Sequence, residues 1–406
     1  MRLFLSRASR PLALSGTVSP AKRPYIASRG YSSTPPEEHR PLPLAGVTVV
    51  SLEQAIAAPF CTRQLADLGA RVIKVERPVV GDFARNYDTR VRGLASHFVW
   101  TNRSKESLAL DLKREKDHAV LMKLLEKADV LVQNLAPGAS ARLGLSHEAL
   151  KEKHPGLIVC DISGEAGMLS VTGTEKEPAK VGISIADISA GMYAYSNILS
   201  ALLQRGKDGK GCQIDISMLE SMVEWMGFPM YYAYDNAPGP VPAGASHAAI
   251  YPYGPFETGD GQSVMLGIQN EREWVNFCND VLSRSELATD PRFSNNSQRS
   301  QNRDELKAIV HEVFSDFTAE ETVARLDKAS IANASVNDMK NLWGHAQLQA
   351  RDRWTNIQTP IGAVPALLPP GSSKSVEKGG YGAQMGSVPA VGEHNEAILA
   401  ELGLSD

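Results

Sequence analysis

The stretch GVTVVSLEQAIAAPFCTRQLADLGARVIKVERP (residues 46–78) decides the fold of this 406-residue chain. Its first seven residues are mostly apolar and β-branched and predict a buried strand over 46–52. Residues 57–70 predict a helix that ends near Gly69, and residues 70–78 predict a second strand that stops at a proline. Together they predict a βαβ unit, with parallel strands and a right-handed crossover.

Further units of the same kind follow along the chain. Strands are predicted over 107–112, 129–132 and 157–162, and a helix over 117–127. The alternation of strands and helices predicts an α/β fold, a doubly wound, Rossmann-like large domain over residues 43–234. No G-x-G-x-x-G follows the first strand, which argues against a nicotinamide or flavin cofactor.

The second half of the chain predicts long apolar helices over 183–205 and 217–234, separated by a short strand. A linker rich in proline and glycine follows at 235–246. Residues 247–335 predict a smaller α+β domain, with a hairpin turn at Asp260-Gly261 and a capping box between Thr318 and Glu321. Residues 336–406 are rich in loops and are expected to return to the large domain.

Residues 1–36 differ in composition from the rest. They contain six Arg and Lys residues, many Ser residues and no Asp or Glu. Such a composition is typical of a mitochondrial transit peptide, the alternative being a disordered tail. We therefore expect cleavage near Tyr31 and a mitochondrial matrix location.

Charge and composition exclude several classes. The formal net charge is −4, so residues 37–406 carry −10 without the six positive charges of the N-terminus. An acidic body argues against nucleic-acid binding. The most apolar run, residues 181–203, contains Asp187 and small polar residues, so no membrane span is predicted. The four cysteines are far apart with no C-x-x-C, and no metal site is predicted.

Several segments in a fixed order resemble class III CoA-transferases, the family of formyl-CoA transferase and the carnitine CoA-transferases. The matching segments are PLAGVTVVSLEQAIAAPFCTRQLADLGARVIKVERPVVGDFAR (43–85), NRSKESLALDLK (102–113), DVLVQNLAPGASARLGL (129–145), GISIADISAGMYAYSNILSALLQR (182–205), GKGCQIDISMLES (209–221), HAAIYPYGPF (247–256), DPRF (290–293) and VGEHN (391–395). The resemblance extends from about residue 43 to the end.

The resemblance implies a Rossmann-like large domain, a smaller domain and two chains interlocked as a homodimer. It implies a reaction that moves CoA from an acyl-CoA to a small carboxylic acid, with a CoA thioester as substrate and no bound cofactor. The family's nucleophile is an aspartate that opens a long apolar helix, and Asp187 matches it. A carboxylate in the first turn of a helix is stabilised by the helix dipole and by free N–H groups.

The resemblance also implies a set of residues that bind CoA. Arg and Lys suit the phosphates, whereas the apolar positions would act through backbone groups or by packing on the adenine. By motif position the candidates are Ile56, Ala57, Arg77, Leu110, Lys113, Asn134, Leu135, Ala136 and Arg142, with Arg103 and Lys105 as weaker ones. Ile56 and Ala57 match a position near the reacting carboxylate, where formyl-CoA transferase has Gln-Ala. The alternatives are plain surface charges at Lys113 and Arg142 and a turn cap at Asn134.

One piece of the family pattern is missing. In the family an Ile-Ser-Gly run continues through a Gly-rich loop to Gly-Tyr-Asp and then a helix. Here Gly164 is followed directly by EAGMLSVTG (165–173), and no Gly-Tyr-Asp occurs in the chain. Three explanations compete: an in-frame piece lost from the gene model, an impaired isoform, or an enzyme that works without the loop. We expect a distorted junction over residues 162–172.

Two alternative functions share this fold. The first is a 2-methylacyl-CoA racemase, which moves an α-proton with a His/Asp pair. Its Asp also matches Asp187, but its His lies on the missing loop, and His247 is a poor substitute. The second is a CoA-binding protein without catalysis, which needs only Arg77, Lys113 and Arg142.

Overall fold

The computed structural model describes residues 41–164, 169–372 and 382–404. The predicted transit peptide, residues 1–36, lies outside the described residues, and so does the centre of the junction expected to be distorted, residues 165–168. The chain divides into two units, one formed by residues 249–336 and a larger one formed by residues 41–248 and 337–404.

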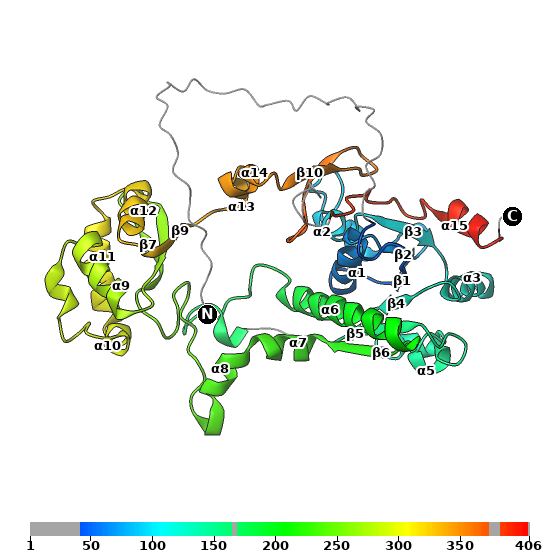
Figure 1. Cartoon of the computed structure of the whole chain (residues 1–406), viewed down its shortest axis with the longest axis horizontal. Helices are drawn as coiled ribbons and strands as arrows, with labels where there is room; N and C mark the ends of the chain where they lie inside the picture. The colour runs from blue at the N-terminus through cyan, green and yellow to red at the C-terminus, as the bar shows by residue number, and fades with distance from the viewer. Residues whose placement is uncertain (1–40, 165–168, 373–381, 405–406) are drawn as a thin grey trace, which may run out of the picture. The chain divides into compact units, whose positions relative to one another are not determined.

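The larger unit is built on a six-stranded sheet in the order β3-β2-β1-β4-β5-β6, with every neighbouring pair parallel (Figure 1). The strands are β1 (Thr48–Leu52), β2 (Arg71–Glu76), β3 (Lys105–Ala109), β4 (Val130–Gln133), β5 (Ile158–Ser163) and β6 (Gln213–Ser217). This is the doubly wound fold that the βαβ pattern predicted. The strand order reverses between β1 and β4, which defines the topological switch point of the sheet.

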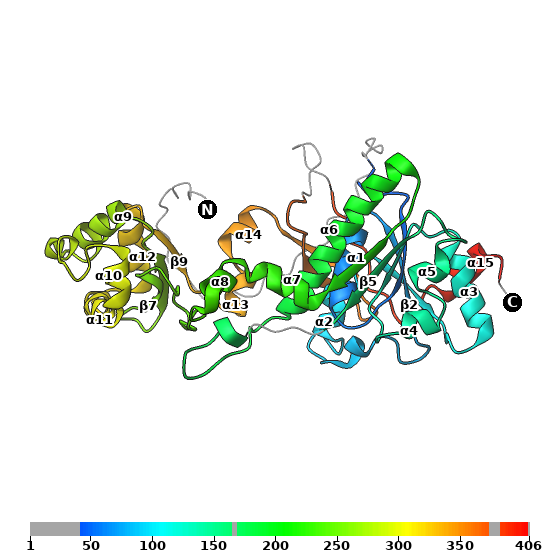
Figure 2. The same cartoon turned by 90° about the horizontal axis from the view of Figure 1, so that it is seen from below.

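Helices cover both faces of this sheet (Figure 2). The helices of the larger unit are α1 (Ala57–Asp67), α2 (Ser96–Thr101), α3 (Glu115–Leu125), α4 (Ala139–Arg142), α5 (His147–Leu150), α6 (Ile185–Asp208), α7 (Met218–Trp225), α8 (Gly227–Tyr232), α13 (Met339–Trp343), α14 (Ala346–Ala350) and α15 (Asn395–Glu401), with short 3-10 turns η1 (Phe83–Asn86), η2 (Leu169–Val171) and η3 (Tyr234–Asn236). Val49 packs with α1 and α6, while Val50 packs with α3 and α15 on the opposite face. Successive strand residues thus fill two cores, as the two-residue period of a strand requires.

The prediction of one continuous helix over 217–234 is wrong, because the structure has two helices there, α7 and α8. The break falls at Met226, which lies just before Gly227. Pro229 has no N–H to donate to the carbonyl of Trp225, so a continuous helix would lose a hydrogen bond there.

The C-terminal segment packs on the larger unit. Within it, β10 (Trp354–Ile357) and β11 (Val364–Leu367) form an antiparallel hairpin. The VGEHN block lies along the edge strand β3, where Asn395 Oδ1 accepts the N–H of Ala109 at 2.8 Å and the N–H of His394 donates to Ser107 O. These bonds cover an edge that would otherwise expose unpaired backbone groups.

The smaller unit is a separate α+β body. Its three-stranded antiparallel sheet consists of β7 (Tyr253–Glu257), β8 (Ser263–Gly267) and β9 (Ala332–Ser335). Its helices are α9 (Glu271–Asn276), α10 (Asn296–Gln301), α11 (Arg303–Phe314) and α12 (Ala319–Lys328), with the π-turn η4 (Phe277–Val281) and the 3-10 turn η5 (Ser285–Ala288). The predicted hairpin and the Thr318–Glu321 capping box are both present.

Candidate active site

At the switch point of the sheet, two hydrogen bonds join the segment that follows β1 to the segment that follows β4. The N–H of Gln54 donates to Asn134 Oδ1 at 2.8 Å, and Asn134 Nδ2 donates to the carbonyl of Gln54 at 2.9 Å. Gln54 follows β1 and Asn134 follows β4, the two strands between which the order reverses. Both polar atoms of the Asn134 side chain are therefore used to hold the loop that leads into α1. Ligands of doubly wound folds bind at this edge of the sheet.

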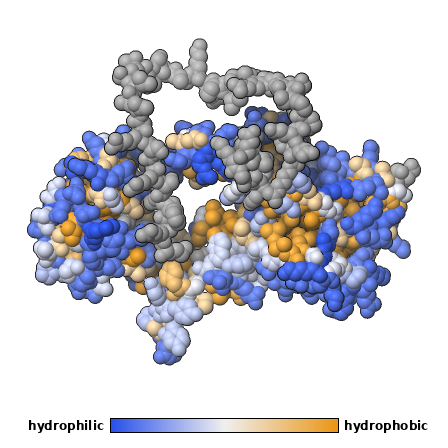
Figure 3. Space-filling view, in the orientation of Figure 1, coloured by the Kyte–Doolittle hydropathy of each residue, from blue (hydrophilic) through white to orange (hydrophobic). Residues whose placement is uncertain are grey.

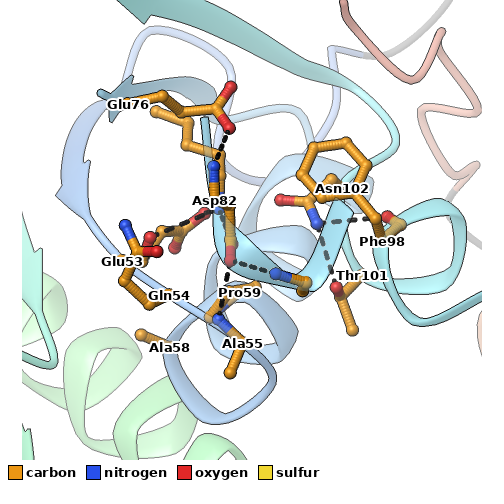
Figure 4. Close-up of polar contacts among 12 residues, drawn as sticks. Glu53, Gln54, Ala55, Ala58, Pro59, Glu76, Asp82, Phe98, Thr101 and Asn102 are labelled. Carbon is orange, nitrogen blue, oxygen red and sulfur yellow. Dashed lines mark hydrogen bonds and ion pairs between the residues drawn. The ribbon is translucent and has the colours of Figure 1, made fainter. Parts of the chain in front are cut away.

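The loop from Glu53 to Ala57 has an unusual backbone. Ala55 has a φ of 63°, in the left-handed region that L-residues with a Cβ rarely adopt. Its N–H donates to Asp82 Oδ1 at 3.1 Å, and the same oxygen accepts the N–H of Ala84 at 2.9 Å (Figure 4). Asp82 thus fixes the conformation that turns the chain from β1 into α1.

Asp187 lies in the first turn of α6, beside the beginning of α1. Its side chain is half-buried, and burial raises the pKa of its carboxyl. Three groups act in the opposite direction: the backbone N–H of Asp187 itself, the backbone N–H of Ala57 and the charge of Lys180. The structure therefore brings together Asp187 and Ala57, two residues 130 positions apart in the chain. Ile56, buried at the start of α1, is the next residue in this loop.

A glycine allows this approach of the two helices. A Cβ on Gly191, one turn beyond Asp187, would lie 2.7 Å from the carbonyl oxygen of Ala57 and 3.1 Å from Phe60 Cδ1. Real Cβ atoms do not come so close to a backbone oxygen. The backbones of α1 and α6 can thus lie side by side only because residue 191 has no side chain.

A cavity of about 370 Å³ opens at the carboxyl ends of the parallel strands. Four of the candidate CoA-binding residues line it: Arg77, Leu110, Lys113 and Leu135. Arg77 and Lys113 are exposed cations, while Leu110 is buried at its base. Its walls combine apolar surface with these two exposed cations. The carboxylates of Glu76 and Asp111 also line it, and they are paired with Arg85 and Arg114. Apolar surface beside exposed cations suits an apolar ring system that carries phosphates.

The remaining candidates lie around this cavity rather than in its wall. Ala136 and Arg142 are exposed, and Leu143, next to Arg142, lines the cavity. Gln54 also lines it. Because Gln54 and Ala57 are three residues apart, their Cα atoms are separated by at most about 11 Å. The cavity and the Asp187 carboxylate thus lie at the two ends of one short loop.

The structure does not support a CoA-binding role for the two weaker candidates, Arg103 and Lys105. Arg103 is buried and donates to both carboxylate oxygens of Asp67, at 2.8 and 2.7 Å. Lys105 is buried and donates to Glu53 Oε1, to Pro59 O and to Asn102 Oδ1. Lys105 is inaccessible to a phosphate, and neither Arg103 nor Lys105 lines the candidate CoA cavity.

Lys105 belongs to a buried cluster that the sequence analysis missed. Glu53 Oε1 lies 2.7 Å from Lys105 Nζ and 3.3 Å from Lys74 Nζ, and Lys74 Nζ lies 2.8 Å from Asp82 Oδ2. All four side chains are inaccessible to solvent or nearly so. The same Asp82 that holds Ala55 is therefore held by Lys74. Lys74 in the middle of the buried strand β2 and Lys105 at the start of β3 are the signal that could have revealed it.

The cluster is balanced electrostatically. Burial raises the pKa of Glu53, but Lys105, Lys74 and the Thr62 hydroxyl outweigh burial and lower it to about 2. Burial lowers the pKa of Lys105 to about 8, although Glu53 opposes this effect. Two carboxylates and two ammonium groups leave no net charge, which reduces the cost of burying them.

Tyr87 is a second residue that the sequence analysis did not select. It follows the short turn η1 and contacts the ring of His97 edge-on, with the ring centroids 5.4 Å apart. Burial raises the pKa of its phenol, and the charges of Asp82 and Asp187 raise it further. Its hydroxyl therefore lies within electrostatic range of the Asp187 carboxylate, at an exposed position.

The described parts of the chain contain neither a cluster of metal-ligating side chains nor a candidate membrane-spanning helix. Within residues 41–164, 169–372 and 382–404, no group of three His, Cys, Asp or Glu side chains is placed to hold a metal ion. No helix in these ranges is both long and apolar enough to cross a bilayer.

A doubly wound domain with a cavity at the carboxyl ends of its strands, and with a half-buried carboxylate beside the loop that follows β1, fits the CoA-thioester enzymes that the sequence resembles. The sequence model of CoA-transferase family III matches residues 44–167 and 164–395. The chain belongs to this family. The two matched segments overlap at residues 164–167, the point at which the sequence predicts a missing loop.

Individual relatives agree with this assignment. The chain is 30% identical to the succinyl-CoA:glutarate CoA-transferase of Homo sapiens, with 89% of this chain and 86% of the relative covered. It is 32% identical to the acetyl-CoA:oxalate CoA-transferase of Acetobacter aceti, covering 76% and 85%. A crystal structure of a CAIB/BAIF family protein from Brucella suis superposes with a TM-score of 0.76 at 30% identity, covering 89% of this chain and all of that one.

Replacing Gly191 tests the contact between α1 and α6. In the Gly191→Ala variant the new Cβ forces the helices apart and weakens the bond from the Ala57 N–H to Asp187. Because misplacement by about 1 Å costs about 100-fold in rate, we expect turnover of acyl-CoA to fall at least tenfold. Gly206→Ala on the same helix is the control, since nothing lies within 4 Å of its added Cβ. Equal turnover in both variants would contradict the role of Gly191.

Replacing Glu53 tests the buried cluster. The Glu53→Gln variant leaves Lys105 without its carboxylate and should lower the free energy of unfolding by roughly 3–5 kcal/mol in urea titrations. Glu106→Gln, which breaks a half-exposed pair with Arg71, should cost less than about 1 kcal/mol. Because the pKa of Glu53 falls from 4.5 to about 2 on folding, its stabilisation is present above pH 4.5 and is lost toward pH 2. The variant should lack this acid-dependent loss, and an equal acid-dependent loss would refute the assignment.

Proposed function

We propose that this enzyme transfers CoA from an acyl-CoA to a carboxylic acid through covalent intermediates on Asp187. The observation that carries the proposal is the position of the Asp187 carboxylate, half-buried against the N–H of Ala57 and one short loop from the cavity that Arg77 and Lys113 line. The membership of CoA-transferase family III supports the same reaction.

The proposed reaction is a series of acyl transfers to and from the Asp187 carboxylate. The ionised Asp187 carboxylate attacks the thioester carbonyl of the donor, which forms a mixed anhydride and releases CoA thiolate. The thiolate then attacks the Asp187 carbonyl of the anhydride, which forms an aspartyl-CoA thioester and releases the donor's acid as a carboxylate. The acceptor carboxylate repeats the two steps in reverse and leaves as its CoA thioester. Covalent catalysis thus divides one difficult exchange into easier steps.

The nearby N–H groups suit this chemistry. An N–H aimed at the carboxyl group, such as that of Ala57, stabilises the negative charge that develops on oxygen when the Asp187 carbonyl is attacked. Burial raises the pKa of Asp187, which makes its carboxylate a stronger base and a better nucleophile once it is ionised.

Succinyl-CoA and a small dicarboxylic acid are the donor and acceptor that we propose. The relatives from Homo sapiens and Mus musculus are named succinyl-CoA:glutarate CoA-transferases, and both are 30% identical to this chain. The composition of residues 1–36 supports a mitochondrial matrix location for this reaction.

A homodimer is part of the proposal. In the larger unit, α7 and α8 expose large apolar side chains, among them Leu219, Trp225, Phe228 and Tyr231. Exposed patches of this kind mark interaction surfaces. An interlocked second chain, as the resemblance implies, would cover them.

The missing loop decides whether this exact chain is fully active. The split of the family match at residues 164–167 supports a deletion at this point. Sequencing the transcript across the codons for residues 162–168 separates the explanations. A transcript that encodes the loop makes the chain an incomplete version of an ordinary enzyme. A Tyr before the loop's Asp then favours the transferase, and a His favours the racemase.

Two other functions remain as alternatives. A 2-methylacyl-CoA racemase would exchange the α-proton of a branched acyl-CoA with deuterated solvent. A CoA-binding protein without catalysis would bind CoA but would not transfer it to any carboxylic acid. The transferase proposal predicts CoA transfer and no exchange of the α-proton.

Replacing the nucleophile tests the proposal in a chain with the loop restored. Asp187→Asn should reduce CoA exchange between succinyl-CoA and glutarate by on the order of 1,000-fold or more, while CoA binding measured by calorimetry is kept. Asp208→Asn, in the last turn of the same helix, is the control and should remain active. An active Asp187→Asn variant would sink the proposal.

The pH profile gives an independent check on Asp187. Because only the ionised carboxylate attacks, kcat/KM falls as the pH drops through the pKa of Asp187. Burial raises that pKa above the usual 3.8, so the acid limb should lie above pH 3.8 in the active enzyme. An acid limb at or below this value would contradict the burial of the nucleophile.

A further inference from the structure

A second, larger cavity of about 690 Å³ lies within the larger unit, away from the candidate CoA cavity. Its walls come from α1, α2, α6, α13 and the β10–β11 hairpin with the residues that follow it. Figure 3 shows that apolar side chains, drawn orange, reach the surface of this unit. A volume in this range is typical of pockets that hold small organic ligands.

The cavity has aromatic walls. Phe60 and Trp100 lie with ring centroids 5.3 Å apart, and Trp343 and Trp354 are stacked at 4.6 Å. Trp343 is 54% exposed and Trp100 is 38% exposed. Large aromatic surfaces that are open to solvent at a cavity wall favour a flat or apolar ligand.

Two buried cations lie at one side of the cavity. Arg63 and Arg103 both line it, and both are more than nine-tenths buried. Each pairs with Asp67 at 2.7 Å, and Asp67 is the one carboxylate in ion-pair contact with either guanidinium in the described part of the chain. The cluster therefore carries an excess positive charge.

The cations are also incompletely satisfied. Among the described residues, Arg63 Nε is buried and has no hydrogen-bond acceptor. Burial lowers the pKa of Arg63 to about 10; Asp67 opposes this effect and Arg103 adds to it. A buried donor without an acceptor costs free energy, and an anion bound beside the two guanidinium groups would offset both the excess charge and the missing acceptor.

We propose that this cavity is a second binding site, which takes a carboxylate with an aromatic or other flat apolar body. The carboxylate lies toward Arg63 and Arg103, and the apolar body lies against Trp100, Trp343 and Trp354. An uncharged ligand would leave the excess positive charge of the cluster unpaired. A small polar anion would leave the aromatic walls uncovered.

The site is separate from the nucleophile. The residues of α6 that line it are Met192 and Tyr195, five and eight residues beyond Asp187, or about 8 and 12 Å along the helix. A carboxylate held at Arg63 and Arg103 is therefore not the reacting carboxylate. The site does not depend on the proposed transfer reaction, because it is defined by its own residues.

Tryptophan fluorescence tests the proposal on the full chain without any turnover. Three of the chain's five tryptophans line the cavity, so a bound ligand should change their emission. The probe is 4-phenylbutyrate, and the matched uncharged probe is 4-phenylbutyramide. We expect a saturable change with the acid and at least tenfold weaker binding of the amide.

Two variants test the two halves of the site. Arg63→Met leaves Asp67 with one guanidinium and should weaken acid binding at least tenfold. Trp343→Ala removes an exposed part of the wall without touching the ion pairs, and should also weaken binding at least tenfold. Arg284→Met, in the smaller unit, is the control and should bind normally. Circular dichroism checks that each variant is folded.

Three results would overturn the proposal. The first is equal binding of acid and amide, and the second is unchanged acid binding in a folded Arg63→Met variant. The third is a dimer in which tryptophan emission does not change with the acid and is also protected from quenching by acrylamide. In that case a second copy of the chain fills the cavity.

Discussion

The short loop between β1 and α1 is the constraint on which the rest of the site depends. Asn134 binds its beginning from β4, and Asp82 binds its middle at Ala55, whose backbone is left-handed. Asp82 is in turn fixed by the buried Lys74. The end of the loop, at Ala57, presents its N–H to Asp187. A single segment thus connects the charged interior, the candidate CoA cavity and the proposed nucleophile.

The fold could be predicted from sequence because its signals are local. The strands β1 and β2 and the helix α1 come from one continuous stretch with clear apolar periods and a glycine stop. The break between α7 and α8 was missed although Pro229 carries its signal, because the apolar pattern continues through it. The strand β9 was missed because its sequence, ANAS, has weak strand propensity and forms only by pairing with β8.

The site was only partly predictable. Asp187 and the residues of the candidate CoA cavity followed from motif positions, but the pairing of Asp187 with Ala57 requires the close packing at Gly191. Motif position places Lys105 among the candidate phosphate ligands and gives no role to Lys74, since sequence alone does not reveal which face of a strand is inside. The aromatic cavity at Arg63 combines segments more than 300 residues apart, which no local pattern predicts.

The central claim is that Asp187 carries CoA covalently, and mass spectrometry of the trapped enzyme tests it most directly. The chain with its loop restored is incubated with succinyl-CoA, quenched in acid and digested, and the peptide that contains Asp187 is analysed. The account predicts a peptide heavier by one CoA less one water, with the modification on Asp187 and absent from the Asp187→Asn variant. An active enzyme whose CoA adduct lies on another residue, or which never forms one, would contradict the account.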